Sequence, residues 1–412
     1  EIAALGSAEK ADKPAPGIKA YTRDNNLYYK GVDGVEHAIT AESDQNIVSG
    51  QSVSRNEFGI HGGTFISPDK TKIAFYQKDE SRVTEFPLLD INSRTGKLFK
   101  IKYPMNGMAS ERVRLGVYDI AAGTTTWLNV TDFDDERYLC DITWSPSGDR
   151  IYIQVLDRAQ KHMRLNWYDP ATGAFGGTFL TEEDPRFVEP EHPLVFLESD
   201  PDKFIYSTNC RDGYWNLYLC SVSEGTVRRL TDVDADVEYF GQDGKFIYYY
   251  SYENSNVGRT FCRVNIKKGT MQNLTPGKGN HTCTISPDGK YFADCCTSLD
   301  VPQTISIYTI DGKKKIKDLL RTERSDLNPK LTNCIIETGT VKSADGQYDN
   351  PYAVMKPAGF DPAKKYPVIL YVYGGPHVRL VKDNYIAGFD KWALILASKG
   401  YIVFIMDNRG TL

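Results

Sequence analysis

The feature that most constrains the fold of this chain is a repeat of short strand-like segments at a nearly constant interval. Each segment carries a tyrosine or another large residue among hydrophobic ones, and successive segments lie 44 to 50 residues apart. Repeats of about 40 to 50 residues with several short strands each are typical of the blades of a β-propeller. The segments are 117–120, 167–169, 217–219, 261–264 and 307–310.

A turn motif built from Ser, Pro, Asp, Gly and Lys alternates with these segments. Proline presets φ for a turn, while Asp and Gly tolerate its left-handed corner. A short run rich in β-branched and aromatic residues follows each motif, which predicts a strand after each turn. The motifs are at 67–70, 145–148, 200–203, 242–245 and 286–290.

The longest interval between turn motifs is 78 residues, from Ser67 to Ser145. It contains an extra segment at 86–111, which we interpret as an insertion within one blade. We count about five blades plus a fragment at 21–29, so we expect a closed propeller to need blades that precede Glu1.

The C-terminal part of the chain has a different pattern, which reads as the opening of a serine hydrolase domain. Residues 368–372 form an apolar run that ends before Gly374-Gly375-Pro376, which predicts a strand buried on both faces of a mostly parallel sheet. Good helix formers at 389–398 precede Gly400, and a second apolar run occupies 401–406. This order predicts a βαβ unit.

The predicted fold is therefore a β-propeller followed by the N-terminal part of an α/β-hydrolase domain, with the boundary between domains 1–325 and 326–412. No GxSxG, the turn that presents the serine of α/β-hydrolases, occurs in the 412 residues. We expect the hydrolase domain to be truncated before its nucleophile, and the fragment by itself to be inactive.

Composition excludes several other classes of protein. With 41% hydrophobic and 25% charged residues, the chain is typical of globular proteins, and a net charge of −5 without a dense basic block argues against nucleic acid as a partner. No apolar stretch reaches the roughly 18 to 20 residues of a membrane span.

The six histidines lack metal-site spacing, so no metal or cofactor is expected. The eight cysteines form no CxxC pair; buried thiols or one or two disulfides are both compatible with them.

Taken together, the blade turns and the C-terminal motifs resemble the prolyl oligopeptidase family of serine peptidases, in particular its dipeptidyl peptidase IV branch, which includes bacterial prolyl tripeptidyl peptidases. The resemblance covers about residues 18–409. The segments that carry it are 50–60 (GQSVSRNEFGI), 64–68 (TFISP), 103–107 (YPMNG), 188–196 (VEPEHPLVF), 211–219 (RDGYWNLYL) and 361–377, which includes YVYGGPH.

The resemblance implies a serine exopeptidase that releases N-terminal di- or tripeptides with proline at the penultimate or third position. It implies that the Ser, Asp and His of the triad lie beyond Leu412. The implied partners are proline-containing peptides with a free N-terminus, and a homodimer through the hydrolase domain is a further expectation. The implied location is periplasmic or secreted.

Three residues of this sequence match functional positions of the family, and Asn56 occupies a fourth such position with a different residue. Tyr373 matches the tyrosine whose hydroxyl helps to hold the oxyanion, a contribution of a few kcal/mol. Glu57, preceded by Asn56 where mammalian members have a second glutamate, matches the acid that pairs with the substrate's α-ammonium. Phe187 resembles a family residue that lines the pocket for the substrate residue before the proline. The alternative is that Phe187 is a buried aromatic residue of a blade.

Two other motifs of the sequence have structural interpretations. His61-Gly62-Gly63 reads as a glycine turn before a blade strand, and Asp407 and Arg409 read as residues that fix a loop. His377 is not expected to be the triad base, because α/β-hydrolases supply that histidine after the serine.

Two alternatives for function remain open at the level of sequence. One is a prolyl endopeptidase or acylaminoacyl peptidase of the same family. The other is a non-catalytic propeller that binds peptides. Cleavage that requires a free amine and depends on Glu57 distinguishes the exopeptidase from the first alternative. A GxSxG some tens of residues after Leu412 would distinguish it from the second.

Overall fold

The structure of the chain is a computed structural model that describes residues 17–253, 255–323 and 333–411. The chain divides into two compact units, one made of 1–211 with 220–227 and the other of 212–219 with 228–412. The predicted boundary between residues 325 and 326 lies outside the described residues.

The first unit begins with a three-stranded sheet and a larger sheet, both antiparallel. The three-stranded sheet contains the predicted fragment at 21–29, and its order is β1-β2-β3. Its strands are β1 (Lys19–Arg23), β2 (Asn26–Lys30) and β3 (Glu36–Ala38). The larger sheet has the order β10-β9-β6-β4, with β5 also paired to β6. Its strands are β4 (Ile47–Ser49), β5 (Thr64–Ile66), β6 (Lys72–Asp79), β9 (Arg112–Asp119) and β10 (Thr124–Trp127).

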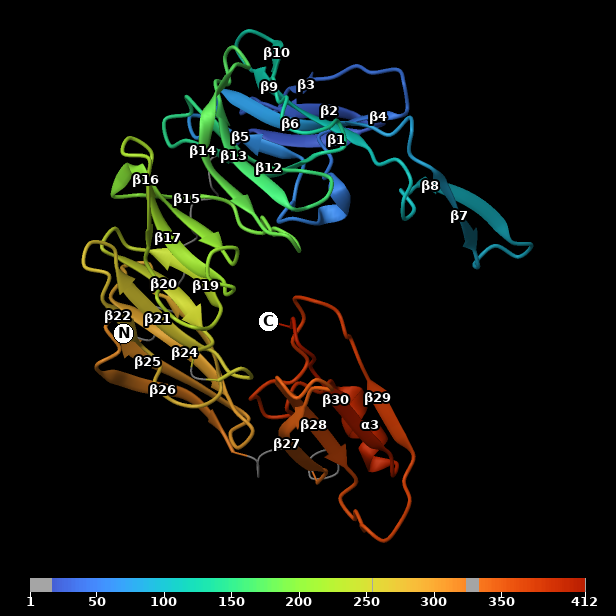
Figure 1. Cartoon of the computed structure of the whole chain (residues 1–412), viewed down its shortest axis with the longest axis vertical. Helices are drawn as coiled ribbons and strands as arrows, with labels where there is room; N and C mark the ends of the chain where they lie inside the picture. The colour runs from blue at the N-terminus through green and yellow to red at the C-terminus, as the bar shows by residue number, and fades with distance from the viewer. Residues whose placement is uncertain (1–16, 254, 324–332, 412) are drawn as a thin grey trace. The chain divides into compact units, whose positions relative to one another are not determined.

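The insertion predicted at 86–111 is a hairpin of β7 (Glu85–Asp90) and β8 (Lys97–Lys102). Among the described residues these two strands pair only with each other, and they appear as the teal hairpin of Figure 1. The hairpin connects β6 to β9, which are neighbours in one sheet. The extra segment is therefore an excursion within one blade, as predicted.

Two four-stranded sheets follow along the chain, with the orders β11-β12-β13-β14 and β15-β16-β17-β18. The strands of the first are β11 (Tyr138–Trp144), β12 (Ile151–Leu156), β13 (His162–Tyr168) and β14 (Phe175–Glu183). The strands of the second are β15 (Val195–Leu197), β16 (Asp200–Thr208), β17 (Asn216–Ser221) and β18 (Thr226–Arg229). The division into two units falls within the second of these sheets.

The second unit contains two further four-stranded sheets of the same design, with the orders β19-β20-β21-β22 and β23-β24-β25-β26. The strands of one are β19 (Val237–Gln242), β20 (Phe246–Ser251), β21 (Thr260–Asn265) and β22 (Met271–Asn273). The strands of the other are β23 (Asn280–Ile285), β24 (Tyr291–Thr297), β25 (Gln303–Thr309) and β26 (Lys315–Thr322). Successive antiparallel sheets, one for each repeat, confirm the β-propeller fold class.

Four of the five turn motifs lie where they were predicted, and the Ser67 motif shows why they form turns. The Ser67 hydroxyl donates to Asp69 at 2.6 Å and accepts from the Lys72 N–H at 2.9 Å, while the Lys70 N–H donates to the Ser67 carbonyl at 2.9 Å. These bonds satisfy the polar groups of the turn locally. Ser286 and Asp288 repeat the first of them at 2.7 Å.

The turn predicted at 200–203 is wrong, because these residues begin strand β16. The turn lies two residues earlier, at Glu198 and Ser199. Asp202 does not close a turn of its own; its carboxylate accepts hydrogen bonds from the hydroxyls of Ser221 and Ser223 at 2.6 and 2.8 Å.

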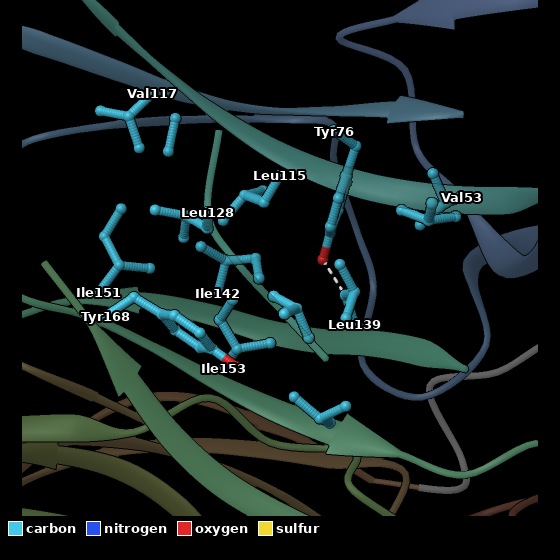
Figure 2. Close-up of a cluster of buried hydrophobic side chains, with 14 of the residues drawn as sticks. Val53, Tyr76, Leu115, Val117, Leu128, Leu139, Ile142, Ile151, Ile153 and Tyr168 are labelled. Carbon is cyan, nitrogen blue, oxygen red and sulfur yellow. Dashed lines mark hydrogen bonds between the residues drawn. The ribbon is translucent and has the colours of Figure 1, made fainter. Parts of the chain in front are cut away.

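The core of the first unit lies between the sheet of β6 and β9 and the sheet of β11 to β13. Figure 2 shows this cluster of buried aliphatic and aromatic side chains. The Tyr76 hydroxyl spans the two sheets and donates to the Leu139 carbonyl at 2.6 Å, so the one polar group of this large side chain is paired. Val53 and Ile60, which come from the loop between β4 and β5, are part of the same cluster.

The C-terminal part of the second unit is a small mixed sheet with the order β27-β28-β30-β29. Its strands are β27 (Ile335–Lys342), β28 (Asp349–Lys356), β29 (Val368–Tyr371) and β30 (Ile402–Met406). Strands β29 and β30 are parallel, and α3 (Lys391–Ser398) connects them, so the predicted βαβ unit is confirmed.

The prediction that the strand at 368–372 is buried on both faces is wrong for the described residues. β29 is the last strand of its sheet, and Val368, Leu370 and Val372 are 61%, 63% and 61% exposed. The buried core of this part instead contains Met355, Val403 and other apolar side chains of β28, β30 and α3. The apolar run correctly predicted that these residues form a strand, but it did not predict that the strand lies at the edge of the sheet.

Candidate functional site

The candidate substrate-binding residue Glu57 lies in the loop between β4 and β5, directly after the short 3₁₀ helix η1 (Ser54–Asn56). The backbone of this loop is unusual, because Ser54, Arg55, Asn56 and Phe58 all have φ between +52° and +64°. Left-handed φ is costly for residues other than glycine, and runs of it persist only where the surroundings impose it. Such strain is concentrated at functional sites, which makes this loop a candidate site.

The two ends of the loop are fixed by the hydrophobic core. Val53 and Ile60 are 1% and 2% exposed and belong to the cluster drawn in Figure 2. Burying two aliphatic side chains of this size contributes about 1.5 to 3 kcal/mol each. The two buried ends therefore restrain the loop, and residues 55–57 between them are exposed at the surface of the unit.

Glu57 and Asn56 are both exposed, but their side chains differ in their contacts. The Asn56 Oδ1 accepts a hydrogen bond from the Ser52 hydroxyl. The Glu57 carboxylate makes no hydrogen bond or ion pair with the residues that the structure describes. Of the two, only Glu57 has a charged acceptor available for an incoming cation.

The insertion within the blade also holds this loop. Glu111 accepts a hydrogen bond from the Ser54 N–H at 2.7 Å. The Arg55 guanidinium donates to the carbonyl of Lys102, at the end of β8, and lies 4.3 Å from the centre of the Tyr103 ring. The prediction from sequence identified the insertion but not its role in supporting the loop that carries Glu57.

A pair of acidic residues lies behind the loop. The Gly59 N–H donates to the Glu191 carboxylate at 3.2 Å, and a Cβ on Gly59 would lie 2.6 Å from Oδ1 of Asp141. Asp141 is 5% exposed, and burial, reinforced by the nearby charge of Glu191, raises its pKa well above the usual range. Its Oδ2 accepts from the Gln154 amide at 2.9 Å, whereas its Oδ1 has no hydrogen-bond partner among the described residues.

Asp141 occupies its position because β11 is irregular there. The register between β11 and β12 shifts after Cys140, and Asp141 has φ of +50°. A bulge redirects a side chain that regular alternation would place elsewhere. The sequence contains a signal for this residue, since an acid is unusual in the otherwise uncharged run LCDITW, although Asp141 belongs to none of the motifs.

Phe187 lies in the loop between β14 and β15, the same loop that supplies Glu191. It is 51% exposed, so the alternative of a buried blade aromatic does not hold. The Arg186 guanidinium is 5.8 Å from the centre of its ring and is itself paired with Asp184 at 3.2 Å. The contact between Gly59 and Glu191 brings the loops of Glu57 and Phe187 together in the first unit.

Tyr373 belongs to the second unit and follows β29 by two residues. Its side chain is 54% exposed. The ring lies against Gly375, where a Cβ would come within 2.8 Å of it, so the absence of a side chain at 375 makes room for this ring position.

The loop that follows Tyr373 is fixed by a buried carboxylate, as the sequence predicted for Asp407. Asp407 is 2% exposed and accepts hydrogen bonds from the N–H groups of Leu380 at 2.9 Å and Val381 at 2.8 Å. Arg409 pairs with Asp345 at 3.0 Å. Asp407 therefore fixes the loop that follows Tyr373, whereas Arg409 is tied to the turn between β27 and β28.

Other features bear on cofactors and on the cysteines. In the described part of the chain, no group of three or more His, Cys, Asp or Glu side chains could hold a metal ion. No helix among the described residues is long and apolar enough to cross a membrane. All eight cysteines are free thiols, and four of them are buried, so the interpretation of cysteines as buried thiols describes half of them.

Comparison with known proteins gives one family. Residues 13–303 match the model of the dipeptidyl peptidase IV (DPP IV) N-terminal region. A dipeptidyl-aminopeptidase B of Aspergillus niger is 25% identical over 97% of this chain, and a protein of Emericella nidulans described under the same name is 26% identical over 97%. The chain spans about half the length of these curated relatives, 48% and 47% respectively.

Two solved bacterial structures are similar in fold and sequence. A protein of Bacteroides ovatus described as a dipeptidyl aminopeptidase IV superposes with a TM-score of 0.85 and 38% identity, over 97% of this chain and 58% of that one. The dipeptidyl peptidase 4 of Porphyromonas gingivalis superposes with a TM-score of 0.82 and 26% identity, over 96% of this chain and 56% of that one.

Proposed function

The chain belongs to the dipeptidyl peptidase IV N-terminal region family, and on that premise we propose that it is part of a serine exopeptidase. The proposed enzyme removes di- or tripeptides from the N-terminus of peptides with proline at the penultimate or third position. The names of the relatives support this class of reaction. The relatives themselves are about twice as long as this chain. The nucleophile, acid and base of acyl transfer are proposed to come from a part of the hydrolase domain outside these 412 residues.

The observation that carries the exopeptidase proposal is the state of Glu57. Its carboxylate is held on a strained loop between two core anchors and has no partner among the described residues. An α-ammonium group carries three donors and a full positive charge, so it would form charge-assisted hydrogen bonds with this carboxylate. A blocked N-terminus lacks the charge and would leave Glu57 unpaired, which explains a preference for free amines.

Two further residues have proposed roles around this anchor. Phe187 offers an exposed aromatic face for the side chain of the residue before proline. Tyr373 is proposed to donate its hydroxyl hydrogen to the oxyanion of the tetrahedral intermediate, an interaction that strengthens as negative charge develops.

The test uses the full-length protein and four chromogenic peptides: Gly-Pro and Ala-Ala-Pro anilides, each with a free and an acetylated N-terminus. We expect cleavage of a free-amine substrate only. Glu57→Gln should lower kcat/KM at least about tenfold, which corresponds to a loss of about 1.4 kcal/mol of transition-state binding. Glu42→Gln is the matched control, since Glu42 is an exposed acid of the same unit outside the loop.

Each outcome separates the proposal from its alternatives. Equal cleavage of free and acetylated peptides would indicate an endopeptidase or acylaminoacyl peptidase. A folded full-length protein that binds the peptides without cleaving them would indicate a binding module. The choice between the Gly-Pro and Ala-Ala-Pro substrates decides how many residues are released.

A further inference from the structure

Strands β23 and β24 place a cysteine, a histidine and an aspartate in contact on one face of a blade. His281 and Cys296 are directly opposite each other in the ladder, and Cys283 and Asp294 form the next such pair on the same face. The Sγ of Cys296 is 3.8 Å from Nε2 of His281, and Nδ1 of His281 is 2.9 Å from the Asp294 carboxylate. The three residues thus form a thiol–imidazole–carboxylate relay.

The burial of the three residues differs in the way that a reactive thiol requires. His281 and Asp294 are 5% and 4% exposed, so the imidazole and its carboxylate are fixed and shielded from water. Cys296 is only half-buried, so its sulfur lies at the accessible end of the relay. Buried thiols without such partners are inert, whereas partly exposed thiols beside an imidazole are reactive.

Backbone atoms of Lys278 and Gly279 lie close to the Cys296 sulfur. Gly279 lies so close that a Cβ there would be 3.2 Å from the Cys296 Sγ, and the Lys278 carbonyl is 3.8 Å from the same atom. Lys278, Gly279 and Ser298 also line a cavity of about 430 Å³ within the second unit. The immediate neighbours of the thiol therefore border a space large enough for a small molecule.

We propose that Cys296 is a nucleophilic thiol, activated by His281 and Asp294, that undergoes exchange with low-molecular-weight disulfides. Nε2 of His281 accepts the thiol proton while the Asp294 carboxylate stabilises the imidazolium. The Cys296 sulfur then attacks one sulfur of the small disulfide, the S–S bond of that molecule breaks, and a mixed disulfide forms on Cys296. The departing thiolate takes the proton from His281, so no other oxidant is needed.

The charged groups around the relay favour the state in which His281 carries the proton. Burial by itself lowers the pKa of His281, but the hydrogen bonds to Asp294 and Cys296 outweigh it and raise that pKa to about 9. Just before β21, the Arg259 guanidinium donates to the His281 carbonyl at 3.1 Å. Further across the same face, the Ser306 hydroxyl donates to Asp318 of β26 at 2.6 Å. The thiol of Cys283 contacts Asp294, and the hydroxyl of Tyr250 accepts from the Cys283 N–H. Glu238 pairs with Arg259 at 3.4 Å, and the Tyr308 ring stacks on Phe292 of β24.

The chain provides internal controls for this proposal. Cys295 adjoins Cys296 but points to the opposite face of the strand, where the Gln303 amide contacts its sulfur. Cys210 is also half-buried and contacts only the Glu183 carbonyl through its sulfur. Neither sulfur has an imidazole partner among the described residues, and burial raises the pKa of Cys210 to about 11, so both should react more slowly than Cys296.

The test is competitive labelling of the native full-length protein with 2,2′-dithiodipyridine, followed by peptide mapping at a series of times. Cys296 should react at least about tenfold faster than Cys295 and Cys210 at pH 7. Cys296→Ser should abolish the fast phase, and Cys295→Ser should leave it unchanged.

Asp294→Asn and His281→Gln should each slow Cys296 to the rate of Cys295 while Cys210 keeps its own rate. The Cys210 rate is the control for a general disturbance of the fold. Because the wild-type comparison needs no substitution, the proposal can be overturned even if these variants do not fold. A Cys296 rate no greater than that of Cys295 and Cys210 in the wild-type protein would overturn it.

Discussion

The backbone N–H of Gly59 donates a hydrogen bond of 3.2 Å to the carboxylate of Glu191. This contact joins two loops that are far apart in the sequence, one carrying Glu57 and the other carrying Phe187. The position of the proposed ammonium anchor is therefore coupled to the position of the proposed pocket residue.

Replacement of Gly59 by alanine should destabilise the first unit. Gly59 has φ of +67°, and a Cβ there would lie 2.6 Å from the Glu191 carbonyl oxygen and from Oδ1 of Asp141. We expect a loss of about 1 to 3 kcal/mol in the free energy of unfolding, measured by urea denaturation. Gly62→Ala is the control, because no atom lies within 4 Å of its Cβ position; it should change the free energy by less than about 0.5 kcal/mol. Equal effects of the two variants would show that the loop moves at no cost.

Asp141→Asn should become increasingly stabilising as pH rises. Burial and the charge of Glu191 raise the pKa of Asp141, so between about pH 4 and the folded-state pKa the unfolded chain releases this proton while the folded chain keeps it. In that window the wild-type contribution falls by up to about 1.4 kcal/mol for each pH unit, and the amide variant lacks this loss. Unfolding free energies at pH 4, 5 and 6 test the trend. A difference between variant and wild type that does not change with pH would mean that Asp141 is ionised in the folded protein.

Asp407→Asn should loosen the loop that follows Tyr373. The carboxylate accepts hydrogen bonds from the Leu380 and Val381 N–H groups in a buried position, and we expect their weakening to cost about 1 to 3 kcal/mol. Hydrogen exchange of these two amides is the direct readout and should accelerate. Asp390→Asn is the matched control, because the exposed Asp390 precedes α3 without a side-chain capping bond. Unchanged protection of Leu380 and Val381 would contradict the assignment.

Tyr373→Phe in the full-length peptidase should lower kcat by about 10² while KM changes little, because the hydroxyl is proposed to act on the charge of the transition state. Gly375→Ala should have an effect in the same direction by displacing the Tyr373 ring, from which its Cβ would be 2.8 Å. Gly359→Ala meets no atom within 4 Å and should leave kcat unchanged. A normal kcat in Tyr373→Phe would remove this hydroxyl from the mechanism.

The blade repeat could be predicted from the sequence because its signals are local. A proline or glycine turn followed by a β-rich run needs no distant contact to be recognised, and four of the five motifs lie at turns. The motif at 200–203 failed because the partners of Asp202 are Ser221 and Ser223, which lie about twenty residues away. Residues 200–203 have the composition of a turn, but Asp202 lies in strand β16 and accepts hydrogen bonds from Ser221 and Ser223.

The surroundings of Glu57 could not be predicted for a similar reason. Its loop is shaped by Glu111, which bonds Ser54, and by Glu191, which bonds Gly59 across 132 positions of sequence. The bulge that directs Asp141 toward this loop depends on the pairing of β11 with β12. The relay of His281, Asp294 and Cys296 likewise appears only when the register of β23 and β24 is known.

The edge position of β29 has a practical consequence for anyone who prepares this chain. One side of the strand pairs with β30, and its other side presents free backbone N–H and C=O groups beside the exposed side chains of Val368, Leu370 and Val372 in the part that the structure describes. An apolar, unpaired edge is a template for strand addition by another chain. The 412 residues should therefore self-associate through β29 as their concentration rises, and a charged residue at the exposed position 370 should suppress that association.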